Sequence, residues 1–307
     1  MKKPELLVTP TQLSDIIPLI EAGADAFVLG EQRYGLRLAG EFNRQDVKSA
    51  VEIAHQSDKK VYVAMNAIIH NDRVDELNDY INYLSSVEVD GIIFGDPAVL
   101  LSVRESSPLM KLHWNTETTA TNYFTANYWG NKGAKRAVLA RELSMDEVIE
   151  MKENAEVEIE VQVHGMTCMF QSKRTLINNY MNFMGKDLEK IENSREAFLH
   201  DKERDTRYPI FQDENGTHIM SPNDICLIEE LGEMLDAGVD AFKIEGILKS
   251  SEYLVKVTQL YRNAIDLYCD KPDTYEQLKA GMYAEIEQIQ PLNRPIDTGF
   301  YFKETVY

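Results

Sequence analysis

Residues 21–28 read EAGADAFV, and residues 236–244 read DAGVDAFKI. In each phrase an amphipathic stretch ends at a glycine, Gly23 or Gly238, and a short apolar run begins soon after it. Glycine is the usual residue just past the end of a helix, because it adopts the left-handed backbone conformation without steric cost. Each phrase therefore predicts a helix that ends where a buried strand begins, which is the repeating unit of an α/β fold.

Six more apolar runs of strand length occur along the chain, and helical patterns such as residues 74–84 and 144–152 lie between most of them. Strands that alternate with helices form parallel βαβ units. An open doubly wound sheet would give similar short strands, but eight of them fit a closed barrel better. We therefore expect an α/β fold, a (β/α)8 TIM-like barrel. The expected strands are Glu5–Thr9, Asp25–Leu29, Lys60–Met65, Asp90–Phe94, Lys111–Trp114, Lys135–Leu139, Val157–Val163 and Asp240–Ile244.

The seventh and eighth expected strands are much farther apart in the sequence than one strand–helix connection requires. Residues 165–223 are therefore expected to form a long insertion at the C-terminal face of the barrel. The barrel with this insertion is expected to span residues 1–269. Residues 270–307 contain Pro291, Pro295 and an aromatic end, and they are expected to form a C-terminal strap packed on the barrel.

The composition narrows the cellular setting and the partners. The chain has 307 residues, three cysteines and a formal net charge of -19. Three cysteines do not build a disulfide framework, and neither a signal peptide nor an apolar run of membrane-spanning length is visible, so we expect a cytoplasmic protein without membrane contact. So acidic a chain repels phosphate at long range and would need a basic partner or a local basic patch to hold RNA. The simpler interpretation is that the charge aids solubility.

Polar residues follow the ends of the expected strands, where barrel enzymes carry their reactive groups. Glu160 precedes His164 by four residues in one strand, so both side chains are expected on the same side, where Glu160 could orient the imidazole. A buried polar pair that is simply satisfied is the alternative. The candidate acid–base and nucleophilic residues are Glu160, His164, Cys168, Lys243 and Glu245. The candidate substrate-binding residues are Arg37, Asn66, Asn115 and Arg141, and Glu117 lies in the same region.

Cys168 follows His164 by four residues, a spacing that suits either a thiol nucleophile or two metal ligands. Cys226 is expected to open the helix before the eighth strand, from which it could approach the same mouth. Two cysteines and one histidine are too few for a closed four-ligand metal site. They could hold one zinc ion with an open position. The alternative, which we prefer, is that these side chains are reduced and bind no metal. No P-loop, G-x-G-x-x-G, paired C-x-x-C, H-E-x-x-H or G-x-S-x-G pattern is present.

Three blocks of the sequence carry a family resemblance. Residues 160–176 read EVQVHGMTCMFQSKRTL, residues 221–227 read SPNDICL, and residues 242–246 read FKIEG. These blocks resemble, in the right order, the collagenase-like, unassigned-type peptidase family numbered thirty-two. The match includes Glu160, His164, Gly165, Cys168, Ser172 and Arg174.

The resemblance implies a role in RNA modification more than in proteolysis. Members similar to this chain act in hydroxylation of a tRNA wobble uridine, a ribosomal RNA cytidine or a ubiquinone precursor. The tRNA pathway is associated with prephenate, and some members work as heterodimers of two family members. The closest resemblance is to the short members that occur in pairs in Gram-positive bacteria and serve tRNA uridine 5-hydroxylation.

The sequence departs from the family pattern at the cluster ligands. Several members hold a four-iron, four-sulfur cluster on four cysteines, whereas here Cys168 and Cys226 match, Thr175 occupies another ligand position, and no cysteine lies between Cys168 and Cys226. Iron–sulfur clusters require thiolates, so we expect this chain to bind no such cluster. Ile247 also stands where the family usually has arginine.

Three functional hypotheses follow from these observations. The first is a subunit of a tRNA uridine hydroxylation system, in which a paralogous subunit supplies the cluster and tRNA is bound only through the complex. The second is a collagenase-like peptidase that uses Cys168 with His164. The third is a non-catalytic module in which Arg37, Arg141 and Lys243 hold a small anion such as prephenate.

Overall fold

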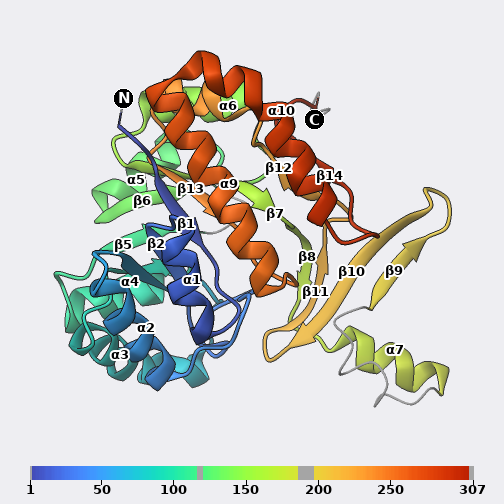
Figure 1. The fold of residues 1–307 in the computed structure, drawn as a ribbon. Coiled ribbons are helices and arrows are strands. Elements are labelled where there is room, and N and C mark those ends of the chain that lie inside the picture. Colours follow the sequence, from blue (N-terminus) through green and yellow to red (C-terminus); the bar gives the residue numbers. More distant parts are fainter. Residues whose placement is uncertain (1, 116–119, 186–196, 304–307) are drawn as a thin grey trace.

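Eight parallel strands form a closed barrel in the computed structural model of the protein, which describes residues 2–115, 120–185 and 197–303. Strands β1 to β7 pair in chain order, and β13 pairs with both β7 and β1 (Figure 1). The expected (β/α)8 fold is confirmed. Glu117 and residues 186–196 and 304–307, parts of the expected site, insertion and strap, lie outside the described residues. The barrel strands are β1 (Glu5–Val8), β2 (Ala26–Leu29), β3 (Lys60–Met65), β4 (Gly91–Phe94), β5 (Leu112–Trp114), β6 (Ala134–Val138), β7 (Glu158–Gly165) and β13 (Ala241–Ile244).

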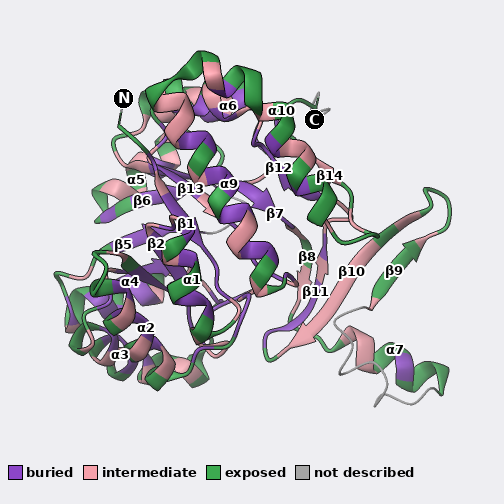
Figure 2. Ribbon diagram, in the orientation of Figure 1, coloured by how far each residue is buried: buried purple, intermediate pink, exposed green. Residues whose placement is uncertain are grey.

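Helices surround the barrel, and their inner faces are buried against the strands (Figure 2). The main apolar core lies between these two layers and includes Leu6, Phe27 and Ile92. Several helices begin at a side chain that accepts a hydrogen bond from the first turn, for example Asn43 and Ser144. The surrounding helices are the 3-10 turn η1 (Leu13–Asp15), α1 (Ile16–Glu21), α2 (Arg44–His55), α3 (Asn71–Ser86), α4 (Pro97–Ser106), α5 (Tyr123–Asn131), α6 (Met145–Asn154), α8 (Leu231–Ala237) and α9 (Ser251–Asp270).

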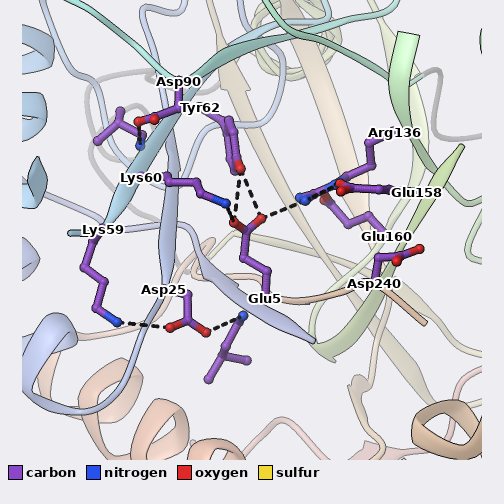
Figure 3. A network of polar contacts seen from close by, with 12 residues as sticks. Glu5, Asp25, Lys59, Lys60, Tyr62, Asp90, Arg136, Glu158, Glu160 and Asp240 are labelled. Atoms are coloured by element: carbon purple, nitrogen blue, oxygen red, sulfur yellow. Dashed lines mark hydrogen bonds and ion pairs between the residues drawn. The ribbon is translucent and has the colours of Figure 1, made fainter. Parts of the chain in front are cut away.

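The barrel interior is filled in layers. A small apolar cluster in the interior comprises Leu7, Ala26, Val28, Tyr62, Ala64, Ile93 and Ala241. Toward the N-terminal ends of the strands the buried Arg136 guanidinium lies between carboxylates, 2.8 Å from both Glu5 and Glu158 and 3.4 Å from Glu160 (Figure 3). A buried charge is tolerated only where it is paired, and these carboxylates pair it. The interior is therefore packed at this end and can open only at the other.

In the described residues, the expected insertion between the seventh and eighth barrel strands forms a separate antiparallel sheet in the order β8-β11-β10-β9, accompanied by helix α7. Its β10–β11 turn lies against the barrel, because Asn215 donates hydrogen bonds to the carbonyls of Gln32 and Gly35. Gly216 in this turn has φ 109°, which favours glycine. Helix α7 and β9 lie at the side of this sheet away from the barrel (Figure 1). The elements are β8 (Cys168–Ser172), α7 (Leu176–Met184), β9 (Phe198–Asp201), β10 (Thr206–Asp213) and β11 (Gly216–Met220).

The C-terminal strap is mostly a helix, α10 (Pro272–Ile289), which packs along α9 (Figure 1). Helix α10 begins at Pro272, and proline in the first turn is typical of helix starts. After the helix, the short strand β14 (Ile296–Asp297) pairs with β12 (Asp224–Cys226), which pairs in turn with β7. None of the described helices is long and apolar enough to cross a bilayer.

A buried charge cluster fastens this strap to the barrel. The Asp224 carboxylate is fully buried, pairs with Lys249 and Arg294, and accepts a 2.6 Å hydrogen bond from Gln290. Burial alone would raise the pKa of Asp224, but Lys249 and Arg294 outweigh it and hold the pKa at about 2. The carboxylate therefore stays charged and joins β12, the segment after β13 and the C-terminal strap.

Substituting Asp224→Ala is expected to lower the free energy of unfolding by about 3–5 kcal/mol, because it leaves Lys249 buried without its partner. Urea denaturation would measure the change. Asp266→Ala is the matched control: its carboxylate pairs with Lys3 at 2.9 Å on the surface, and its loss should cost below about 1 kcal/mol. Equal effects of the two substitutions would contradict the assigned role of Asp224.

Candidate functional site

A cavity of about 390 Å³ opens at the C-terminal ends of the barrel strands. Barrel loops form one side of it, and strand β8 of the inserted sheet forms the other. The described residues that line it include Arg37, Asn66, Asp96, Asn115 and Arg141 from the barrel, and Cys168, Met169, Phe170 and Gln171 from the insertion. All four predicted substrate-binding residues and Cys168 therefore border one cavity.

A smaller cavity of about 30 Å³ lies deeper and shares Leu36, Arg37, Asn66 and Asn115 with the first. Its remaining lining comes largely from the barrel interior and includes Thr9, Glu160, Lys243 and Glu245. The structure thus brings Glu160, Lys243 and Glu245 together below the predicted binding residues. Acid–base groups lie at the floor of the site and amide and guanidinium groups at its entrance.

Glu245 is held in a fixed position at this floor. Its carboxylate accepts a 2.7 Å hydrogen bond from the Thr9 hydroxyl and lies 3.2 Å from the Lys243 ammonium. Gly165 packs against the backbone of Glu245 with φ 98°, and a Cβ there would lie 2.4 Å from the Glu245 carbonyl oxygen. This close contact explains the glycine that follows His164 in the sequence.

Glu160 is the buried acid of the site. Burial raises its pKa above the usual value, and the opposing charges of Arg136 and Lys243 only partly offset that rise. A carboxyl group with a raised pKa can hold a proton nearer neutral pH than an exposed one, which suits proton transfer to or from a bound molecule. The floor of the cavity therefore combines a proton carrier with the charged pair Lys243–Glu245.

The entrance is positioned by hydrogen bonds between the barrel loops and the inserted sheet. The Asn66 side-chain oxygen accepts a 2.8 Å bond from the backbone N–H of Leu36. Arg37, next in the chain, donates to the Gln171 side chain of β8 at 3.4 Å. The loop after β2 therefore connects the barrel to the insertion along the cavity wall.

His164 does not face this cavity, so the expectation that it shares a side with Glu160 is wrong. Its Nε2 lies 2.7 Å from the Tyr253 hydroxyl, and Tyr261 packs edge-on against its ring, both on the outer helix α9. The cause is a register shift: Lys243 pairs with Gln162, but Ile244 pairs with His164. The additional residue in β7 inverts the alternation of side chains beyond it.

Cys168 and Cys226 lie in different surroundings. Cys168 packs with Met166, Met220 and Ile247 beside the cavity, whereas Cys226 is buried in the main core, where Tyr261 contacts it. Cys226 was expected to open a helix, but this expectation is wrong, because Cys226 is the last residue of strand β12. Burial raises the pKa of Cys226 to about 12. Across the described part of the chain, no three His, Cys, Asp or Glu side chains are placed to hold a metal ion.

Two further polar residues beside Cys168 were missed from the sequence. His218 and Asp213 lie on β11 and β10, with His218 Nε2 at 2.9 Å from an Asp213 oxygen. The signal was available: Asp213 begins the turn DENG and His218 follows that turn closely. In a hairpin, residues opposite each other and residues two apart on one strand lie on the same face. Their significance depended on β8 pairing with β11, which the sequence pattern does not indicate.

The fold and site define a TIM-type barrel whose C-terminal mouth is covered on one side by an inserted antiparallel sheet. Residues 11–306 match Peptidase family U32, and the chain belongs to this family. The chain is 66% identical to tRNA hydroxylation protein P2 of Bacillus subtilis, over the full length of both. It is 35% identical to tRNA hydroxylation protein P1 of the same organism, a match covering 89% of this chain and 66% of P1.

A solved structure supports the fold. The U32 peptidase Mk0906 superposes with a TM-score of 0.51 and 14% sequence identity, over 80% of this chain and 94% of that one. Identity at this level shows a shared architecture alone.

His164 is expected to make stability depend on pH. Burial lowers its pKa to about 3, so in weak acid the unfolded chain binds a proton that the folded chain excludes. Stability is then lost as the pH falls, by up to about 1.4 kcal/mol per pH unit between about pH 6.5 and pH 4.

The His164→Gln variant should lack this contribution, so its unfolding free energy should change less across that range. Urea denaturation at several pH values would measure both proteins. Parallel pH dependences would show that His164 titrates in the folded protein as it does in the unfolded one.

Proposed function

We propose that this chain is a cytoplasmic subunit of a tRNA uridine 5-hydroxylation system. The observation that carries the proposal is the 66% identity to tRNA hydroxylation protein P2, which extends over the whole of both chains. A full-length match at this level supports a shared substrate and not only a shared barrel. The structure adds a cavity that suits a base taken out of its strand.

The chemistry of the cavity supports a nucleobase as its occupant. Asn66 and Asn115 carry amide groups that can donate to and accept from the polar edge of a uracil ring. Phe170 is half exposed at the same cavity, and aromatic side chains stack on unpaired bases. Arg37 and Arg141 could then bind the phosphates that flank the base. Glu160 would hold or release a proton at the floor.

The overall charge supports a partner. A net charge of -19 opposes the approach of a polyanion, so binding of tRNA by this chain alone is unfavourable. Bacillus subtilis has both a P1 and a P2 protein, each related to this chain. We infer that a paralogous subunit binds this chain and supplies the basic surface that tRNA requires.

The cysteines do not fit a four-iron, four-sulfur cluster. Such a cluster needs several thiolates around one point, whereas Cys226 is buried in the main core with a pKa of about 12 and Cys168 lies beside the cavity. Cys269, the third cysteine, is at the end of α9. We infer that any cluster of the system is bound by the partner subunit, and no step of this proposal passes through a cluster in this chain.

Deletion of the gene, together with its paralogue, is expected to abolish 5-hydroxyuridine in tRNA, measured by mass spectrometry of digested nucleosides. Restoring wild-type copies of both should restore it. A Lys243→Met copy should reduce the modification at least about a hundredfold if Lys243 takes part in proton transfer. Lys256→Met is the control, because Lys256 pairs with Glu285 on the surface. Fully hydroxylated tRNA in the double deletion would exclude the proposed function.

A second candidate function is the binding of a small dianion such as prephenate. Arg37 and Arg141 line one cavity, and Lys243 lines its deeper continuation. Guanidinium groups bind carboxylates through paired, charge-assisted hydrogen bonds. Prephenate would then serve as the cosubstrate of the hydroxylation system, and Arg37 and Arg141 would bind its carboxylates in place of the phosphates that flank the base.

Prephenate at a hundred times its dissociation constant is expected to stabilise the protein by about 2.7 kcal/mol, which raises the melting temperature by several degrees. Differential scanning fluorimetry would detect it. Arg141→Ala should remove the shift, whereas Arg104→Ala, an exposed residue that bonds the Lys132 carbonyl, should leave it intact. An unchanged melting temperature across the titration would exclude prephenate as a ligand of this chain.

A further inference from the structure

One face of the inserted sheet carries a cysteine, a histidine and an aspartate together. In the strand registers Met220 lies opposite Cys168, and Phe211 lies opposite His218. His218 and Met220 are two residues apart on β11, and Phe211 and Asp213 are two apart on β10, so all of these side chains share one face. Cys168, Phe211 and Met220 pack in one cluster with Ala39 and Ile247, so this is the face toward the barrel.

His218 is held in one orientation. The residue is fully buried, and its ring stacks on Phe211 with centroids 4.9 Å apart. Its Nε2 lies 2.9 Å from the Asp213 carboxylate, and its Nδ1 is buried with no hydrogen-bond partner among the described residues. A buried ring nitrogen without a hydrogen bond is energetically unfavourable, which indicates that Nδ1 accepts a proton or a hydrogen bond in the working protein.

The strand register places Cys168 opposite Met220, and His218 is two residues from Met220 on the same face, so the Cys168 side chain lies on the same face as the His218 ring. Burial and the nearby Arg37 lower the pKa of His218, whereas Asp213 and Cys168 raise it. The effect of Asp213 and Cys168 is the larger, so the pKa of His218 lies above its usual value. The thiol now directs its hydrogen to the carbonyl of Phe170, 3.3 Å away. Cys168 also lines the 390 Å³ cavity, on the side that the inserted sheet forms.

We propose that Cys168 is a nucleophile, that His218 is its base, and that Asp213 positions His218. An imidazole that takes the proton of a cysteine leaves a thiolate, the reactive form, and a carboxylate on the far ring nitrogen keeps the imidazole in the required tautomer. The sequence suggested His164 for this role, but His164 faces α9 on the other side of β7. The base therefore comes from the insertion and not from the barrel strand.

The chemical class of substrate is a carbon–carbon double bond conjugated to a carbonyl. The Cys168 proton moves to His218 Nδ1, and the thiolate forms a bond to the β-carbon of the substrate. The π pair of the double bond moves toward the carbonyl, and the α-carbon then takes the proton back from the imidazolium. Atoms and electrons balance without an oxidant or reductant, and the reverse sequence releases the substrate.

The C5–C6 double bond of uracil, conjugated to the C4 carbonyl, belongs to this class. Addition of the thiolate at C6 would make C5 electron-rich, and C5 is the carbon that a uridine 5-hydroxylation system changes. The assignment of uracil rests on the proposed function, whereas the nucleophile itself does not. The two parts can therefore be tested separately.

N-ethylmaleimide, a carbonyl-conjugated alkene, is the probe for the nucleophile. Near neutral pH we expect Cys168 to react before Cys269, and Cys226 to stay unmodified because it is buried with a raised pKa. Peptide mass spectrometry measures all three rates in one sample. His218→Gln, which keeps a donor for Asp213 but lacks the basic nitrogen, should slow Cys168 about tenfold relative to Cys269. Asp213→Asn should slow it less.

The matched control is the pair His200 and Asp205, which has the same 2.9 Å contact and five-residue spacing but lies exposed on the same insertion. His200→Gln should leave the Cys168 rate unchanged. Thermal melting of each variant separates lost reactivity from lost folding, and the Cys269 rate serves as a reference within each molecule. Equal Cys168 rates in folded wild-type and His218→Gln protein would overturn the proposal.

The uracil assignment is tested in the double-deletion strain. Cys168→Ser and His218→Gln copies should fail to restore 5-hydroxyuridine, whereas His200→Gln should restore it. Full restoration by Cys168→Ser would overturn the uracil assignment and leave the proposed function standing. Fully modified tRNA in the strain without either gene would instead remove the proposed function, and the maleimide result would still decide the nucleophile.

Discussion

Strand β13 pairs with β1 on one edge and with β7 on the other, and this double pairing makes the sheet a closed barrel. Closure gives the molecule an interior, and the paired Arg136 fills that interior at one end. The cavities that the barrel residues line lie at the C-terminal mouth, which is where parallel barrels place their sites. Lys243 lies in β13, the strand that closes the barrel, and Glu245 directly follows that strand, so both side chains line the floor of the mouth.

The same closure divides the polar residues of β7 between two environments. The register shift against β13 leaves Glu160 in the interior and turns His164 toward α9. His164 and Tyr253 then join a buried network in which Tyr253 donates to Gln290, and Gln290 donates to Asp224. A histidine with a pKa held near 3 by burial is a neutral packing residue at physiological pH. His164 thus contributes to the attachment of the strap and does not face the mouth.

The insertion changes what a bare barrel mouth could do. It adds a wall with an aromatic residue, Phe170, and a thiol, Cys168, to a cavity whose other groups are amides, guanidiniums and carboxylates. Its attachment through Asn215 and Arg37 keeps that wall against the barrel. The match to tRNA hydroxylation protein P2 of Bacillus subtilis covers all of this chain and therefore includes the insertion. The cysteine that remains in the wall lies beside His218 and so has a chemical role available without a cluster.

The barrel strands and the family could both be predicted from the sequence, whereas the strands of the insertion and helix α10 could not. Eight short apolar runs separated by helical patterns predicted the barrel strands, and blocks such as HGMTC and FKIEG predicted the family, because burial and backbone geometry are recorded locally along the chain. Of the nine candidate site residues named from the sequence, all but His164 meet at the mouth, since strand ends of a barrel converge by topology. The direction of His164 and the placement of Cys168 and His218 on one face of the inserted sheet became visible in the folded protein. The bulge in β7 depends on its register with another strand, and the pairing of β8 with β11 joins residues about fifty positions apart. Neither feature can be predicted from a single segment of the sequence.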